Sequence, residues 1–164
     1  MSSAIAHNID IEHPIDLIEG LACAHEWPCE RGTQDDVNVC ISGVHSDYHL
    51  AISWRPDLGG LHVASVLDTR APKGKRADVH ELLALINEQL WLGHFDIWSG
   101  DGAILFRSTM FVSGGLSEGQ CQELINHALE TCERFFPAFQ FLIWAGHSPQ
   151  EALQSSLFET RGDA

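Results

Sequence analysis

Apolar and polar residues alternate with a period of two in three consecutive segments between residues 37 and 68. Successive side chains of a strand point to opposite sides, so each segment predicts a strand with one apolar face. The links at 43–47 and 56–60 are short and rich in turn residues, which predicts antiparallel hairpins. The three predicted strands are 37–42, 48–55 and 61–68.

Other segments repeat apolar residues at the spacing of an amphipathic helix. The first predicted helix begins at Pro14 and ends near Trp27-Pro28, because a proline disfavours helical geometry at the residue before it. Pro137 interrupts a later apolar stripe, where we expect a kink or a break. Three further starts have the spacing of an N-cap residue and its partner: Asp78 with Glu81, Ser117 with Gln120, and Ser148 with Glu151.

A second predicted hairpin joins residues 94–98 to residues 103–112 through a glycine-rich turn. The longer strand is apolar on both faces, with Phe106 on one and Leu105 and Phe111 on the other. Such a strand should be covered on both faces, and a second subunit would supply the second cover. The predicted element order is α-β-β-β-α-β-β-α with an extra C-terminal helix, an α+β fold.

The 164 residues suit one domain, which buries roughly 70% of its unfolded surface at this size. We expect a loose arm over 1–12, a single domain over 13–158 and a polar tail over 159–164. We find neither an internal repeat nor a linker long enough to divide the chain.

The chain is strongly acidic, with nine basic and 23 acidic residues and a formal charge of -14. Nucleic-acid binding depends on Lys and Arg that displace counterions, so we expect no nucleic-acid partner and repulsion from anionic membranes. One basic cluster stands out, which is either a solvated loop or a docking spot for an acidic segment. It consists of Arg70, Lys73, Lys75 and Arg76.

Five cysteines, an N-terminus without an export signal and a large core predict reduced thiols in the cytoplasm. The most apolar run, residues 135–145, is too short to cross a bilayer, so we expect no membrane insertion.

The residues that suggest chemistry form no complete site. Cys23, His25 and Cys29 are the densest possible metal ligands, yet a structural zinc site needs four ligands, usually as two close pairs. His94 and Asp96 share one side of a strand and would orient a base, but no activated nucleophile accompanies them. We therefore predict no catalytic residue, no metal and no cofactor.

Aromatic residues are the candidates for a binding surface. Most of them should fill the core, but Trp and Tyr are also favoured anchors of protein interfaces. Our candidate interface residues are Trp54, Trp98, Phe106 and Phe111.

The second half of the chain resembles the YbjN-domain family of bacterial proteins. The resemblance is carried by Asn87 near the end of a helix, by Gly93-His94-Phe95 at the start of a strand, and by Arg107 in the long strand. It spans about residues 14–158 and is most specific over 79–146. It implies a fold like that of type III secretion chaperones, a two-layer sandwich with helices on one face of a twisted antiparallel sheet, and a dimer. The family is described as sensory-transduction regulators and has no established catalytic residues.

The sequence thus predicts a non-enzymatic, protein-binding regulator or chaperone-like adaptor that acts as a homodimer on an unidentified protein client. The alternative is a small-ligand sensor with an aromatic-lined pocket between sheet and helices.

Overall fold

The computed structural model describes residues 12–162, and side chains as far as Phe158. The predicted loose arm lies outside these residues except for Glu12, and the last two residues of the predicted polar tail also lie outside them.

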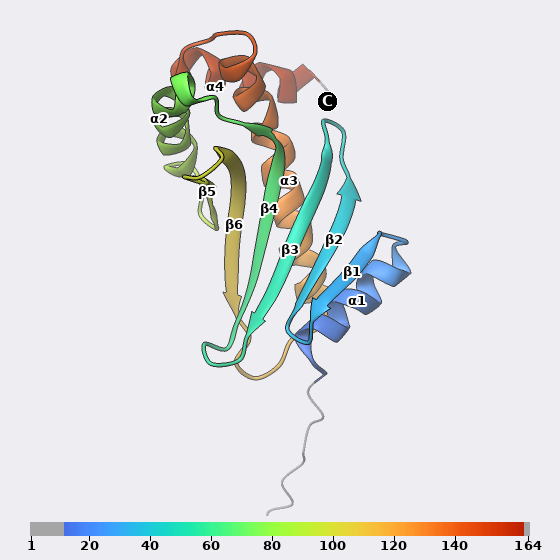
Figure 1. The fold of residues 1–164 in the computed structure, drawn as a ribbon. Helices are drawn as coiled ribbons and strands as arrows, with labels where there is room; N and C mark the ends of the chain where they lie inside the picture. Colours follow the sequence, from blue (N-terminus) through green and yellow to red (C-terminus); the bar gives the residue numbers. More distant parts are fainter. Residues whose placement is uncertain (1–11, 163–164) are drawn as a thin grey trace, which may run out of the picture.

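A single antiparallel sheet of six strands forms the front layer of the molecule (Figure 1). The strands are β1 (Cys29–Thr33), β2 (Asp36–Ser42), β3 (Asp47–Arg55), β4 (Gly60–Arg70), β5 (His94–Ile97) and β6 (Ala103–Phe111). Their order across the sheet is β1-β2-β3-β4-β6-β5. The three predicted strands between residues 37 and 68 and the second hairpin are confirmed.

The helices lie behind this sheet and above its upper end (Figure 1). They are α1 (Pro14–Ala24), α2 (Arg76–Asn87), α3 (Glu118–Ile143) and α4 (Pro149–Gly162), with a 3-10 turn at Lys73–Lys75. The long helix α3 contacts β4 and β6, α1 contacts β1 to β3, and α2 packs beside β5. The α+β prediction of helices on one face of an antiparallel sheet is therefore confirmed.

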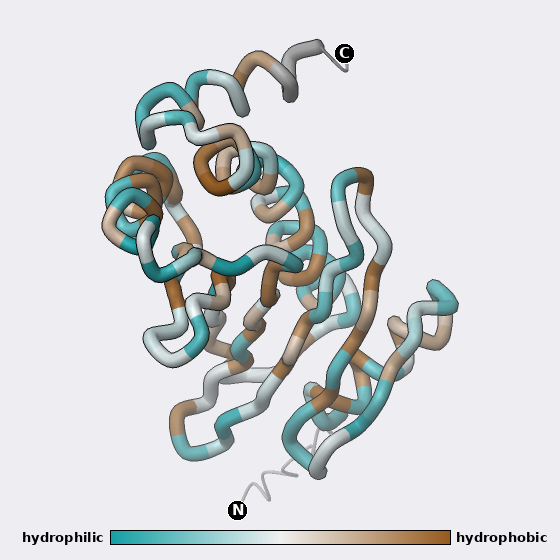
Figure 2. The backbone as a smooth tube through the Cα atoms, turned by 45° about the horizontal axis from the view of Figure 1, so that its top comes forward, coloured by the Kyte–Doolittle hydropathy of each residue, from teal (hydrophilic) through white to brown (hydrophobic). Residues whose placement is uncertain are grey.

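The core lies between the sheet and the helices, and the core residues of β2 to β6 face that way. Hydrophobic and hydrophilic residues alternate along the strands (Figure 2). Phe95 of β5 is at the centre of an aromatic cluster, with ring centroids 5.3 Å from Phe106, 5.9 Å from Phe135 and 5.4 Å from Phe139. All four rings are buried, so large side chains fill the space between the layers.

Strand β1 was not predicted from the sequence. Its residues do not alternate between apolar and polar, and four of the five are exposed. It is held instead by backbone pairing with β2 and by Arg31, which lies 2.6 Å from Asp16 and 3.0 Å from Glu19 of α1. Polar contacts with a distant helix, rather than burial, fix this edge strand.

Two predicted helix starts are confirmed by their hydrogen bonds, and one is wrong. Ser117 and Gln120 form a reciprocal capping box at α3, and Ser148 and Glu151 exchange the same two bonds at α4. Helix α2, however, begins at Arg76 rather than Asp78, because it continues directly from the 3-10 turn.

Two helix ends also differ from the prediction. Helix α1 ends at Ala24, three residues before Trp27. Helix α3 is not broken by Pro137, since its neighbours on both sides keep helical geometry, and α4 continues into the predicted polar tail.

The outer edge of β5 is closed by a side chain. The Asn87 amide donates from Nδ2 to the Phe95 carbonyl at 3.0 Å, and its Oδ1 accepts from the Phe95 N–H at 2.8 Å. Gly93, with φ +73°, turns the chain from α2 into this strand, where a Cβ would lie 2.4 Å from the Phe106 ring. The end of α2 and the start of β5 are therefore one hydrogen-bonded unit.

Candidate functional site

The candidate site is the sheet surface that faces away from the helices, which we call the open face. Among residues 12–162 no helix lies against it (Figure 1). Its centre is formed by side chains that alternate with the core residues of β3, β4 and β6. These are His49, Ala51 and Ser53 of β3, His62, Ala64 and Val66 of β4, and Arg107, Thr109 and Phe111 of β6. Leu105 of β6 lies on the same side but is only 4% exposed.

The strand register fixes which residues are neighbours across this face. One row crosses all six strands and consists of Glu30, Asn38, Ala51, Ala64, Arg107 and His94. Ala51 and Ala64 are at the middle of the row, and because their side chains are small, the surface is recessed there. A carboxylate is at one end of the row, and an arginine with a histidine is at the other.

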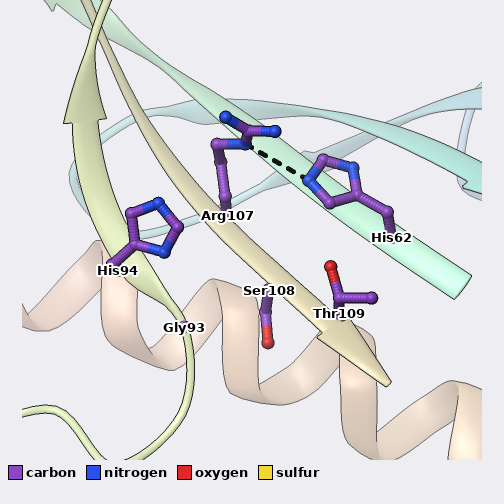
Figure 3. Close-up of a pocket in the computed structure, with 6 residues that line it drawn as sticks. All are labelled: His62, Gly93, His94, Arg107, Ser108 and Thr109. Atoms are coloured by element: carbon purple, nitrogen blue, oxygen red, sulfur yellow. Dashed lines mark hydrogen bonds between the residues drawn. The ribbon is translucent and has the colours of Figure 1, made fainter. Parts of the chain in front are cut away.

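Arg107 is held between two histidines (Figure 3). Its Nε donates to Nε2 of His62 at 3.3 Å, which leaves the proton of a neutral His62 ring on Nδ1. Asp96 is the nearby carboxylate, but its Oδ2 is 3.8 Å from the Arg107 Nη1, too far for a hydrogen bond. Arg107 therefore retains guanidinium donors that face outward.

We predict that partial burial and the nearby Arg107 together lower the pKa of His62. Partial burial lowers the pKa of His62 below its ordinary 6.5, and the charge of Arg107 and the proximity of His94 lower the pKa further. This histidine therefore favours folding above pH 6.5, and the contribution is lost as the pH falls through its folded pKa. In the Arg107→Gln variant the pKa of His62 should rise, as measured by an NMR titration of the ring carbons.

A matched control for this titration is Lys73→Gln, which removes an exposed positive charge from the 3-10 turn. It should leave the His62 pKa unchanged. An equal rise in both variants would mean that the net charge, and not the contact with Arg107, sets the pKa.

Four shallow hollows of about 320 to 560 Å³ adjoin the open face. The hollow in Figure 3 lies beside Arg107, between His62 and His94. The largest shares Arg107 and His62 but also reaches Leu58 and Phe111. A surface with charged, small and exposed apolar side chains is suited to contact with another protein.

The four predicted interface residues lie in different environments. Phe106 is fully buried on the helix side of β6, so its ring is not available to a partner, and Trp54 is partly buried against the core. Trp98 is 62% exposed and Phe111 is 80% exposed. These two side chains are therefore accessible to a partner.

His62 was not predicted from the sequence to be a functional residue. Alternation along β4 could have placed it opposite the core, but its contact with Arg107 depends on the register of β4 against β6, which the sequence does not reveal.

The cysteines do not gather into a metal site. In the part of the chain that the structure describes, no group of three His, Cys, Asp or Glu side chains is placed to hold a metal ion. Burial raises the pKa of Cys121 to about 11 and that of Cys132 to about 12. Both are protonated thiols that fill the core, as small apolar side chains do.

Most of the predicted basic cluster contacts its own chain. Lys75 donates to the carbonyls of Leu142 and Ile143, where it caps the end of α3. Arg76 donates to the Ser99 carbonyl, and Arg70 pairs with Asp101. These contacts give the cluster a structural role and weaken its interpretation as a docking spot.

The chain matches the model of a known protein family. The YbjN family model, described as "Putative bacterial sensory transduction regulator", matches residues 14–141. The chain belongs to the YbjN family. No curated protein sequence matches this YbjN-family chain.

A solved structure with a similar fold is that of YbjN from E. coli, titled "a putative transcription regulator". The TM-score is 0.56 with 8% identity, and the match covers 90% of this chain and 94% of that chain. This likeness shows a shared fold.

The residues that carry the YbjN resemblance meet in one region of the fold. Asn87 holds the backbone of Phe95, Gly93 makes the turn between them, and Arg107 is paired with His94 across β5 and β6. The first two therefore build the edge of the sheet, and Arg107 lies on the open face beside it. None of the described helices is long and apolar enough to cross a membrane.

Proposed function

We propose that this YbjN-family chain is a non-catalytic regulator or chaperone-like adaptor in the cytoplasm, which works as a homodimer and binds a protein client. The open face is the observation that carries the proposal. Phe111 of β6 is exposed on a six-stranded sheet of which the described helices cover only the opposite side, and exposed Trp98 follows directly after β5. Phe111 lines the largest of the four hollows together with Leu58, which is 63% exposed, and adjoining exposed apolar groups are typical of protein-binding sites.

The polar groups of the open face support binding better than catalysis. The Nε2 atom of His62, the ring's acceptor, is occupied by the bond from Arg107, so that atom is not free to accept a substrate proton. Described cysteines near this face, Cys29 and Cys40, are free thiols, and a cytoplasmic regulator would keep them reduced.

The charge of the chain limits the kind of client. At -14 the chain favours partners with basic surfaces and disfavours nucleic acid. The E. coli protein of similar fold is titled "a putative transcription regulator". For this chain we propose regulation through contacts with proteins rather than with DNA.

The small-ligand alternative receives less support from the geometry. It requires a pocket between sheet and helices, but buried aromatic rings of β5, β6 and α3 occupy that layer. The four hollows described above adjoin the open face instead.

The proposal is tested by affinity capture from bacterial lysate with the full chain as bait, followed by quantitative mass spectrometry. A specific client should be recovered by the wild type and depleted at least tenfold by the Trp98→Ser/Phe111→Ser variant. Phe158→Ser is the matched control, because Phe158 is 75% exposed but belongs to α4. Equal recovery by both variants would contradict a client site on the open face.

A further inference from the structure

We propose that the outer edge of β1 binds an extended, basic segment of another protein, which pairs with β1 as an added antiparallel strand. This edge is a different surface from the open face, and the inference does not rest on the client proposed there. Three features point to the partner: the unbonded peptide groups of β1, the contrast with the protected edge at β5, and the acidic surroundings.

The peptide groups of β1 face alternately toward β2 and away from it. The N–H of Cys40 in β2 donates to the Pro28 carbonyl at 2.9 Å, just before β1 begins. Because alternate residues of an antiparallel ladder bond the same neighbour, Pro28 and Glu30 face β2, whereas Cys29 and Arg31 face outward. In the described part of the chain, the outward N–H and carbonyl groups of these two residues have no hydrogen-bond partner.

The two edges of the sheet differ in their protection (Figure 1). At β5 the Asn87 side chain bonds both outward groups of Phe95. At β1 the nearest long side chain is that of Arg31, and it bonds the Thr33 and Gln34 carbonyls and two carboxylates of α1 instead. Unpaired peptide groups at an edge are a template for an added strand. The sheet is therefore open to extension at β1.

Carboxylates flank this edge on both sides of the sheet. Asp16 and Glu19 of α1 lie on the helix side and are 51% and 37% exposed, but both already pair with Arg31. Glu30 lies on the side of the open face, in register with Asn38. It has no ion-pair partner among the described residues. Since opposite charges stabilise directly facing strand residues, we place a lysine or arginine of the added segment opposite Glu30.

The whole region around this edge is acidic. Residues 13–36 contain α1, β1 and their turns, and β2 adds no lysine or arginine. The two histidines of the region are already bonded, His13 to Asp35 at 3.0 Å and His25 to Gln122 at 2.8 Å. The six carboxylates are Asp16, Glu19, Glu26, Glu30, Asp35 and Asp36, and the one guanidinium is Arg31. A basic partner is therefore attracted to this edge.

A second copy of the chain is disfavoured as the occupant. Pairing of β1 with its own equivalent about a two-fold axis at Glu30 sets two carboxylates opposite each other, and an axis at Arg31 does the same with two guanidiniums. In any register, residues 13–36 of both copies would lie side by side with their excess of carboxylates. Glu118, in the first turn of α3 beside α1, adds to the repulsion. A basic segment of another protein avoids it.

Binding of a defined peptide to the full chain tests the proposal. The probe is acetyl-Val-Lys-Val-Lys-Val-Lys-Val-amide, and the acidic control peptide has glutamate at each lysine position. Titration calorimetry should show that the probe binds at least about tenfold more tightly than the control. By NMR, hydrogen exchange of the Cys29 and Arg31 amides should slow by at least about tenfold with the probe bound. The Glu30 amide, already bonded to β2, should not change.

Two variants at the edge separate peptide pairing from charge. Cys29→Pro removes one outward N–H, and an edge strand tolerates a proline whose nitrogen faces away from its neighbour. It should weaken probe binding by about tenfold, whereas Cys29→Ala keeps the N–H and should bind as the wild type does. Glu30→Lys should reverse the preference, so that the acidic peptide binds more tightly.

A modified probe gives the same test on the wild-type chain, so the outcome does not depend on the folding of Cys29→Pro. With lysine opposite Glu30, the valine N–H groups of the probe face β1 and the lysine N–H groups face away. N-methylation of the valines should therefore abolish binding, and N-methylation of the lysines should weaken it far less. Equal losses in the two modified probes would overturn the proposed pairing.

The remaining outcomes also decide the proposal. Equal affinity for the basic and acidic peptides, or unchanged exchange at Cys29 and Arg31 with the probe bound, would overturn it. Slow exchange of both amides without any probe would overturn it as well: slowing that grows with protein concentration would assign the edge to a second copy, and slowing at every concentration to the chain itself. The Trp98→Ser/Phe111→Ser variant should bind the probe as the wild type does, so this result is independent of the client site on the open face.

Discussion

Replacing Phe95 by alanine should lower the free energy of unfolding by about 3–5 kcal/mol, the range for removal of a buried phenylalanine. The ring is 2% exposed and contacts three other aromatic rings, from β6 and α3. Its loss leaves a cavity where sheet and helix meet, which the rigid neighbouring rings fill only in part. Urea denaturation followed by circular dichroism, at one fixed protein concentration, measures the change.

Phe158→Ala is the control for Phe95→Ala, because its ring is 75% exposed. It should change the free energy of unfolding by less than about 0.5 kcal/mol. If both variants lost the same free energy, the aromatic cluster would not be the centre of the core.

Asn87→Ala should lower the free energy of unfolding by about 2–3 kcal/mol. The variant loses two hydrogen bonds, each worth roughly 1 kcal/mol, and leaves the N–H and carbonyl of Phe95 without their partner. Asn87→Asp keeps the acceptor for the Phe95 N–H but has no donor for the carbonyl, so it should fall between the wild type and Asn87→Ala.

The control for Asn87 is Gln89→Ala, two residues farther along the chain. The Gln89 side chain donates an exposed bond to the Leu85 carbonyl at 3.3 Å, and loss of that bond should cost little. Hydrogen exchange of the Phe95 amide gives a local readout: it should accelerate in Asn87→Ala and remain slow in Gln89→Ala. An unchanged rate in Asn87→Ala would mean that β5 is held by β6 alone.

Buried strands could be predicted from the sequence, because burial produces a periodic pattern of apolar residues. Hydrogen bonds between distant segments produce no such pattern. Strand β3 was predictable because Tyr48, Leu50 and Ile52 are fully buried and alternate with residues of the open face. Strand β1 was not, because Arg31 and its two carboxylate partners hold it in place of apolar contacts. The start of α2 was misplaced for a related reason: Lys75, just before it, is fixed by carbonyls of α3 more than sixty residues away.

The candidate site was predictable only in part. Exposed Phe111 and the open side of β6 follow from the doubly apolar pattern of that strand, whereas the pattern could not assign Phe106 to the core of its own chain. The contact between His62 and Arg107 joins residues 45 positions apart. Pairing of this kind depends on strand register, which local periodicity leaves open.

The two hydrogen bonds between the Asn87 side chain and the backbone of Phe95 also limit how these molecules can aggregate. An edge strand with unbonded peptide groups is a template on which another chain can add, and repeated addition leads to fibres. At β5 the outward-facing N–H and carbonyl of Phe95 are already hydrogen-bonded, so an added strand would first have to displace the side-chain amide of Asn87. Growth of the sheet past β5 is therefore discouraged.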